Sequence, residues 1–161
     1  MAYVLISPLN WGLGHASRDV PIIRELLRNH HEVTIAAGGN ALQLLKKEFP
    51  TCNCIDFPDY PLADNRGKFF FPRFTAHVPA LVKALAEERR NLSNILKETT
   101  YDLIISDSRP GVYSDSIPSI QVSHPVHQSF PFIVWPIELI ALYVNGRGFK
   151  KFDLVIIPDN P

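Results

Sequence analysis

Hydrophobic positions along the chain fall into short continuous runs, separated by stretches in which apolar residues recur every three or four positions. The runs at 3–7 (YVLIS) and 32–37 (EVTIAA) are typical of strands buried on both faces of a parallel sheet. Four further strands are predicted, in chain order, at 52–57, 102–106, 117–123 and 152–157.

Helical spacing follows the first run, over Ser17–Asn29. Because proline is tolerated only near a helix start, Pro21 places the predicted N-terminus close to His15–Arg18. The other predicted helices span 41–49, 75–98 and 132–143. In the helix at 75–98, the same argument puts Pro79 in the first turn, and the charged run 87–90 is expected to face solvent.

Strands and helices therefore alternate along one domain that covers residues 1–161, which predicts an α/β fold with a mostly parallel sheet of about six to seven strands. The segment Pro58–Phe74 has no clear period and is predicted to be a long loop. In open α/β sheets, ligands bind beyond the carboxyl ends of the strands, so candidate chemistry is sought in the residues that follow each strand.

Composition narrows the function classes. Sixteen Lys and Arg balance sixteen Asp and Glu, so the chain lacks the basic excess of a general nucleic-acid binder. Two cysteines cannot build a disulfide framework. The N-terminus does not resemble a signal peptide, and the apolar stretch 130–144 falls short of the roughly 20 residues that span a bilayer. A cytoplasmic protein is expected.

A glycine-containing loop lies between the first strand and the first helix. Gly12-Leu13-Gly14-His15-Ala16-Ser17 offers close backbone approach and free helix N–H groups to an anion. A dinucleotide site is disfavoured, because the second strand ends in Ala36-Ala37-Gly38-Gly39 without an acidic residue for a ribose. No GK[ST] follows, which excludes a P-loop. A tight strand–helix turn with no ligand is the alternative interpretation.

His15 lies where this loop enters the helix, and Asp107 ends the fourth strand on the same sheet edge. A carboxylate within reach of one imidazole nitrogen fixes the tautomer and stabilises the imidazolium, as in catalytic triads. The alternative is that His15 caps the helix and Asp107 caps a turn before Pro110.

Three stretches carry a resemblance to a known family: PLNWGLGHASRDVPIIREL (8–26), YDLIISDSRPGVY (101–113) and IPSIQVSHP (117–125). They resemble the N-terminal domain of GT-B glycosyltransferases, in particular MurG-like and diacylglycerol-glucosyltransferase-like enzymes. The resemblance implies a Rossmann-like three-layer domain that binds the acceptor, and a C-terminal domain that binds most of a nucleotide-diphosphate sugar. It also implies His15 as catalytic base, supported by Asp107.

The resemblance further implies hexosyl transfer to an acceptor hydroxyl, with the nucleotide sugar as substrate and no cofactor. The residues expected to contact the ligands are Gly12, Leu13, Gly14 and Ser17 for the donor phosphates, and Asn10, Arg18, Arg109 and His124 for the acceptor. Arg18 and Arg109 have an alternative role in surface pairs with Asp19 or Asp107. No metal site is expected, because Cys52 and Cys54 lie on one face of a strand, away from its ends.

The sequence departs from the family in two places. It ends at Asp159-Asn160-Pro161, about where the second domain would begin, so the donor-binding domain is expected to be absent from this chain, which would be incomplete or inactive alone. MurG-like enzymes also carry an extra glycine before the histidine. The missing domain or a partner chain is therefore expected to complete the site.

Two further questions stay open on the sequence alone. The run Phe69-Phe70-Phe71 and the apolar segment 130–144 fit a lipid-linked acceptor or peripheral contact with a membrane, but also contact with another domain or an ordinary core. The second function hypothesis is a non-catalytic binding or scaffold subunit that recruits a donor-binding chain. An oxidoreductase dinucleotide domain is disfavoured by the missing acid after the second strand.

Overall fold

The computed structural model describes residues 1–10, 13–59, 70–123 and 151–158, and gives only the backbone for 70–82. Within these residues, six strands form one sheet in the order β3-β2-β1-β4-β5-β6, and every neighbouring pair is parallel. Their bounds are β1 Tyr3–Pro8, β2 Glu32–Ala37, β3 Asn53–Asp56, β4 Leu103–Asp107, β5 Ser119–Val122 and β6 Leu154–Ile156. The predicted α/β class with a parallel sheet is confirmed.

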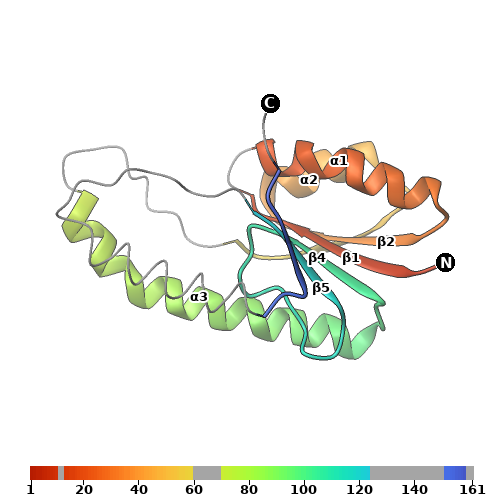
Figure 1. Ribbon diagram of the computed structural model, residues 1–161. Helices are drawn as coiled ribbons and strands as arrows, with labels where there is room; N and C mark the ends of the chain where they lie inside the picture. The colour runs from red at the N-terminus through yellow and green to blue at the C-terminus, as the bar shows by residue number, and fades with distance from the viewer. Residues whose placement is uncertain (11–12, 60–69, 124–150, 159–161) are drawn as a thin grey trace.

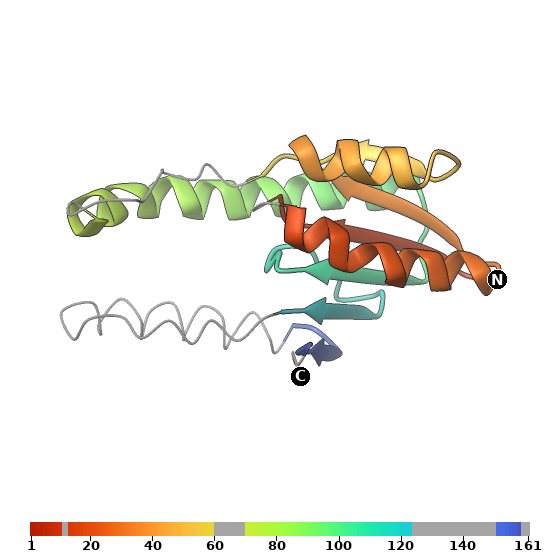
Figure 2. The same ribbon diagram turned by 90° about the horizontal axis from the view of Figure 1, so that it is seen from above.

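Helices cover both faces of this sheet. In the described part of the chain they are α1 Leu13–Arg28, α2 Gly39–Glu48 and α3 Phe70–Glu98. Figure 1 shows α1 and α2 together on one face and α3 on the other, which gives three layers. Seen from above in Figure 2, the first turns of α3 extend beyond the carboxyl ends of the strands.

The continuous apolar runs have a direct structural cause. Side chains alternate between the two faces of a strand, so a strand covered on both faces needs apolar residues at every position. Val4 and Ile6 of β1 pack in the cluster beneath α1 and α2, and Leu5 packs on the opposite side with Leu92 and Ile95 of α3. All three β1 side chains are almost fully buried.

The strand order places the ends of β1 and β4 side by side at the point where the chain reverses its direction across the sheet. β1 continues through α1 to β2 on one side, while β4 lies on its other side. The register pairs Pro8 with Asp107, so both strands end at the same level. A crevice at such a reversal is the usual ligand site of open α/β sheets.

Two helix starts differ from the sequence prediction. α1 begins at Leu13, so Pro21 lies inside the helix and cannot donate to the carbonyl of Ser17. α3 begins at Phe70, which makes the end of the predicted 58–74 loop helical and leaves Pro79 well beyond the first turn. A proline inside a helix costs about 3 kcal/mol. In α1, packing of Ala16 and Ile23 against the sheet offsets this cost.

Other differences are small: α2 begins at Gly39 rather than at residue 41, and β5, inside the sheet, is shorter than the predicted 117–123. β3 and β6 are each shorter than the predicted 52–57 and 152–157, because an edge strand is paired on one side only and frays at its ends. The predicted loop residues 60–69 and the predicted helix 132–143 lie outside the described residues. Among the described helices, none has the length and apolarity needed to cross a membrane.

Candidate active site

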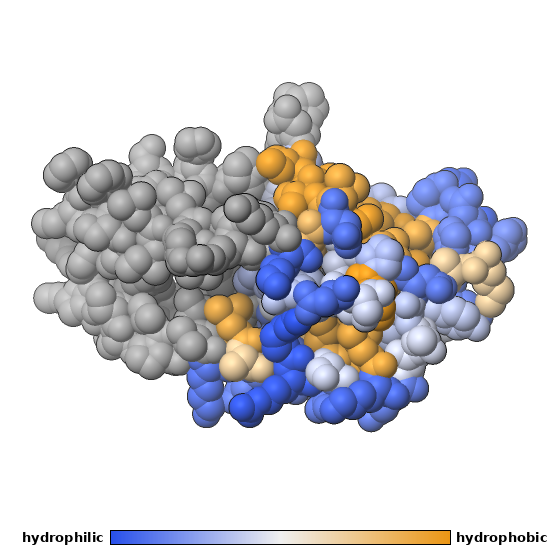
Figure 3. Space-filling model, turned by 60° about the horizontal axis from the view of Figure 1, so that its bottom comes forward, coloured by the Kyte–Doolittle hydropathy of each residue, from blue (hydrophilic) through white to orange (hydrophobic). Residues whose placement is uncertain are grey.

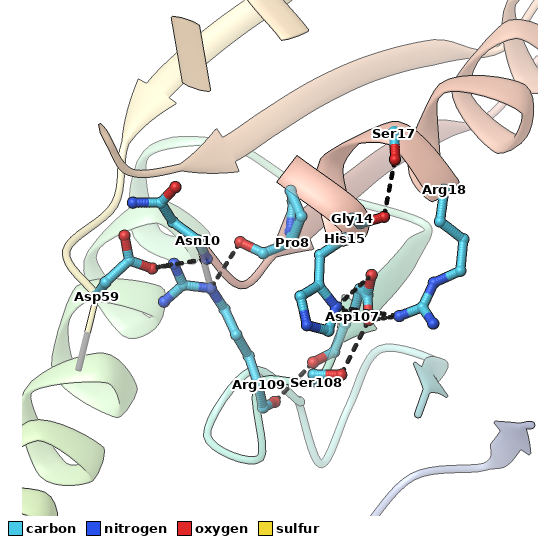
Figure 4. Close-up of polar contacts among 11 residues, drawn as sticks. Pro8, Asn10, Gly14, His15, Ser17, Arg18, Asp59, Asp107, Ser108 and Arg109 are labelled. Carbon is cyan, nitrogen blue, oxygen red and sulfur yellow. Dashed lines mark hydrogen bonds and ion pairs between the residues drawn. The ribbon is translucent and has the colours of Figure 1, made fainter. Parts of the chain in front are cut away.

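His15 and Asp107 meet at the reversal point of the sheet. The first turn of α1 carries His15, and β4 ends at Asp107. His15 Nδ1 lies 3.1 Å from Asp107 Oδ1 and 3.2 Å from Oδ2. Asp107 is fully buried, while the His15 side chain is 19% exposed. Figure 4 shows the imidazole directed at the carboxylate, with Arg18 approaching from the same helix.

The surroundings of Asp107 determine the tautomer of His15. Arg18 Nη2 forms an ion pair with Asp107 Oδ1, and Ser108 Oγ donates to the same oxygen at 3.0 Å. An ionised carboxylate only accepts hydrogen bonds, so Nδ1 of His15 must donate to it. Arg18 Nη2 and His15 Nδ1 then lie 3.1 Å apart because both donate to the same Asp107 carboxylate. The lone pair of a neutral His15 therefore lies on Nε2, the nitrogen turned away from Asp107.

A second carboxyl group lies behind this pair. Asp19 is fully buried on the stripe of α1 that also buries Ala16 and Ile23, and neither of its oxygens has a hydrogen-bond partner among the described residues. Burial raises the pKa of Asp19 well above its usual range, and the nearby charge of Asp107 raises it further. Asp19 is thus a buried carboxyl group whose environment favours the protonated form, rather than a surface partner of Arg18.

The start of α1 is open. Leu13, Gly14 and Ser17 are exposed, and a Cβ built on Gly14 meets no described atom within 4 Å. The protein's own packing therefore does not require glycine at this position. Ser17 Oγ donates to the Gly14 carbonyl at 3.0 Å, which leaves the hydroxyl only its acceptor lone pairs. Gly12, the fourth predicted phosphate contact, lies outside the described residues.

Arg109 is buried and engaged by the protein itself. Its Nε donates to the Pro8 carbonyl at 3.0 Å, and its Nη1 donates to the Pro58 carbonyl at 3.0 Å and to Glu88 Oε1 at 3.1 Å. Nη2 forms an ion pair with Asp59. The guanidinium is 0% exposed, so the predicted contact of Arg109 with an acceptor gives way to a role inside the protein.

Asn10 joins the same network. Its backbone N–H donates to Asp59 Oδ1 at 3.2 Å, and its side-chain Oδ1 accepts from the N–H of Ala41, near the start of α2, at 3.1 Å. Gly39 has a φ of +48°, and a Cβ there would approach Asn10 Nδ2 to 2.4 Å. The predicted acceptor residue Asn10 thus ties a strand end to α2. His124 lies outside the described residues.

Sequence reasoning missed two members of this network, Asp59 and Glu88. Glu88 was expected on a solvated face, but it is 3% exposed and also accepts the Gly111 N–H at 2.9 Å. A signal was available: Glu88 lies at helical spacing from the buried Leu92 and Ile95, so it belongs to the apolar stripe of α3. Asp59 follows the third strand, at the edge already identified as the ligand side.

No group of three His, Cys, Asp or Glu side chains in the described ranges is arranged to hold a metal ion. Cys52 and Cys54 are free thiols, and partial burial raises the pKa of both. Thiols of this kind are poor nucleophiles and poor metal ligands at neutral pH.

No family model matches the chain. In sequence it is 27% identical over 93% of its length to an uncharacterized glycosyltransferase of Methanosarcina acetivorans. In structure it is similar to MurG of Acinetobacter baumannii, with a TM-score of 0.57, 13% identity and coverage of 96% of this chain and 40% of that one. It is also similar to UGT89C1 of Arabidopsis thaliana in complex with UDP, with a TM-score of 0.60, 14% identity and coverage of 97% and 44%.

The chain spans 41% of the length of the archaeal relative and a similar share of the solved structures. The sequence similarity covers almost the whole chain. The structural similarity extends to the six-stranded parallel sheet and its two helical layers. The chain is thus similar in sequence to a glycosyltransferase, and its parallel sheet with helices on both faces matches the Rossmann-like half of the GT-B fold.

Proposed function

We propose that this chain is the acceptor-binding half of a glycosyltransferase that moves a sugar from a nucleotide-diphosphate sugar to an acceptor hydroxyl. The observation that carries the proposal is the His15–Asp107 pair, in which a buried carboxylate accepts from Nδ1 and leaves Nε2 as a base. The pair lies at the carboxyl ends of β1 and β4, where ligands of this class of sheet bind.

In this reaction Nε2 of His15 takes the proton of the acceptor hydroxyl. The acceptor oxygen forms its bond to the anomeric carbon of the sugar as the bond from that carbon to the diphosphate breaks, and the nucleoside diphosphate leaves with the electron pair. The buried Asp107 carboxylate stabilises the imidazolium, as the aspartate of a catalytic triad does. A positioned general base of this kind contributes about 10²-fold to 10⁴-fold to the rate.

The start of α1 suits the negative charge that develops on the leaving group. Its first turn carries no acidic residue, and a helix N-terminus favours anions through its free N–H groups. The open space beside Gly14 admits a phosphate close to the backbone. Arg18, 19% exposed and next to His15, lies one turn further along α1 and pairs with Asp107. We assign the donor phosphates to the first turn and the acceptor to the side of Arg18, while His124, outside the described residues, keeps its predicted acceptor role.

Calorimetric titration with a panel of UDP- and GDP-sugars tests this division of labour. The titration is run on this chain alone and on the chain together with a donor-binding domain. Binding only by the combined form supports an acceptor half that needs a second domain to hold the nucleotide. Tight binding by the 161 residues alone would contradict the proposal, because the glycine loop would then be a self-sufficient nucleotide pocket.

One observation favours the second candidate function, a subunit that recruits a donor-binding chain. β6, at the edge of the sheet, exposes Leu154 and Ile156, and Ile157 follows, at 51%, 44% and 56%. Figure 3 shows apolar side chains gathered in patches on the face of the molecule in view. Such a patch on an unpaired strand edge suits a protein interface. If Ile156→Lys abolishes association with the donor domain while His15→Ala leaves turnover intact, this candidate replaces the first.

A further inference from the structure

Arg109 touches three segments that are far apart in sequence. Its guanidinium reaches the carbonyl at the end of β1, the Pro58-Asp59 segment after β3, and Glu88 in the middle of α3. The guanidinium is rigid and planar, and its N–H groups donate to all three segments. The three segments are therefore fixed relative to one another. Arg109 is fully buried and Glu88 is 2% exposed at its side chain, which keeps water from replacing these contacts.

The first arm of this network controls the side of His15. Pro8, whose carbonyl accepts from Arg109 Nε at 3.0 Å, ends β1 immediately before the loop that leads into α1. Asp59, the ion-pair partner of Arg109, also accepts the backbone N–H of Asn10 at 3.2 Å. The start of the glycine loop is therefore held at two points, one bonded to Arg109 directly and one through Asp59.

The second arm controls the side of Asp107. Between Asp107 and Arg109 lies Ser108, whose φ of +61° places a non-glycine residue in the left-handed region. Such a conformation persists only where the surroundings hold it in place. Here Ser106 Oγ donates to the Arg109 carbonyl at 2.6 Å, and the Ser108 N–H donates to the Val122 carbonyl at 2.9 Å. The strained turn aims the Asp107 side chain at His15 while the Arg109 side chain turns into the interior, as Figure 4 shows.

We infer that Arg109 is the positioning residue that sets the His15 loop and the Asp107 turn to each other, with Glu88 and Asp59 as its anchors. The inference rests on the proposed function and deepens it. The hydrogen bond that His15 Nδ1 donates to Asp107 is what leaves Nε2 free to act as the base. It also gives α3 a link to the site, through Glu88, that the sequence did not indicate.

Two substitutions test this role without touching His15 or Asp107. Glu88→Gln and Asp59→Asn each remove one charged anchor and keep the shape of the side chain. The ring-nitrogen chemical shifts of His15, which report the tautomer and the Nδ1 hydrogen bond, are expected to change in both variants. In the complete enzyme, kcat is expected to fall about 10-fold with the KM for donor unchanged, as small misplacements of catalytic groups cost rate. Arg24→Gln, which removes an exposed ion pair at 3.6 Å, is the matched control.

A purely structural network would lower the melting temperature of both variants and leave the His15 signals and kcat as in the wild type, and that result overturns the inference. Arg109→Lys is a third variant, and its failure to fold leaves the other two informative. The nuclear magnetic resonance readout needs no turnover. Shifted His15 signals in Glu88→Gln together with an active His15→Ala variant would therefore refute the proposed function and keep the geometric role of Arg109.

Discussion

The Asp19→Asn variant tests whether the buried Asp19 carboxyl group is protonated or ionised in the folded protein. The unfolded chain releases the Asp19 proton near the ordinary value of 3.8, whereas in the folded chain burial, and then the charge of Asp107, raise the pKa well above it. Between these two values the folded state holds one proton more than the unfolded state, so the free energy of unfolding falls as pH rises, by about 1.4 kcal/mol per pH unit.

Asparagine has the shape of the protonated acid and does not titrate. We expect wild type and Asp19→Asn to have similar stabilities below pH 3.8, and the variant to gain on the wild type as pH rises, until the folded-state pKa is passed. Urea unfolding at a series of pH values measures the difference. Asp56→Asn, which changes an exposed carboxyl group on β3, is the matched control. A difference between wild type and Asp19→Asn that stays constant above pH 3.8 would contradict this reasoning, because it would show that folding does not raise the pKa of Asp19.

Three further predictions concern the first turn of α1 and the turn at Asp107 and Ser108. Gly14→Ala is expected to stabilise α1 by about 0.5–1 kcal/mol, because no described atom opposes the methyl group, and thermal melts measure this gain. In the complete enzyme the same methyl group is expected to weaken donor binding about 10-fold, which calorimetry measures. Ser108→Gly is expected to be about 1 kcal/mol more stable to urea than Ser108→Ala, because both lose the hydroxyl but only glycine relieves the left-handed backbone; equal stabilities would remove the strain argument. Asp107→Asn is expected to lower turnover about 10³-fold in a variant whose circular dichroism is unchanged, and a mild loss would make Asp107 a structural residue.

The sheet was predictable because its cause is local in sequence. A strand that is covered on both faces is mostly apolar at successive positions, and β1, β2 and β4 show this pattern apart from a few polar residues such as Ser7, Thr34 and Ser106. Helix starts were less predictable, because the proline rule considers one lost hydrogen bond and ignores tertiary packing. The start of α1 was therefore predicted too late in the sequence. Packing of Ile23 against the sheet outweighs the backbone hydrogen bond that Pro21 cannot donate.

The pairing of His15 with Asp107 could be predicted from topology, since parallel strands end at one edge and the residues that follow β1 and β4 meet there. The burial of Arg109 could not, because its partners come from a segment after β3 and from α3, which sequence order does not place beside β4. The burial of Asp19 could have been predicted as that of Glu88 could, since Asp19 lies at helical spacing from Ala16 and Ile23 on the buried stripe of α1.

The turnover of His15→Ala in the complete enzyme, compared with wild type under saturating donor and acceptor, tests the central claim most directly. The account predicts a loss of about 10²-fold or more, because the alanine variant lacks the nitrogen that takes the acceptor's proton. Circular dichroism and donor titration of the same variant establish that folding and donor binding persist. Turnover near that of the wild type would contradict the account and remove His15 as the base.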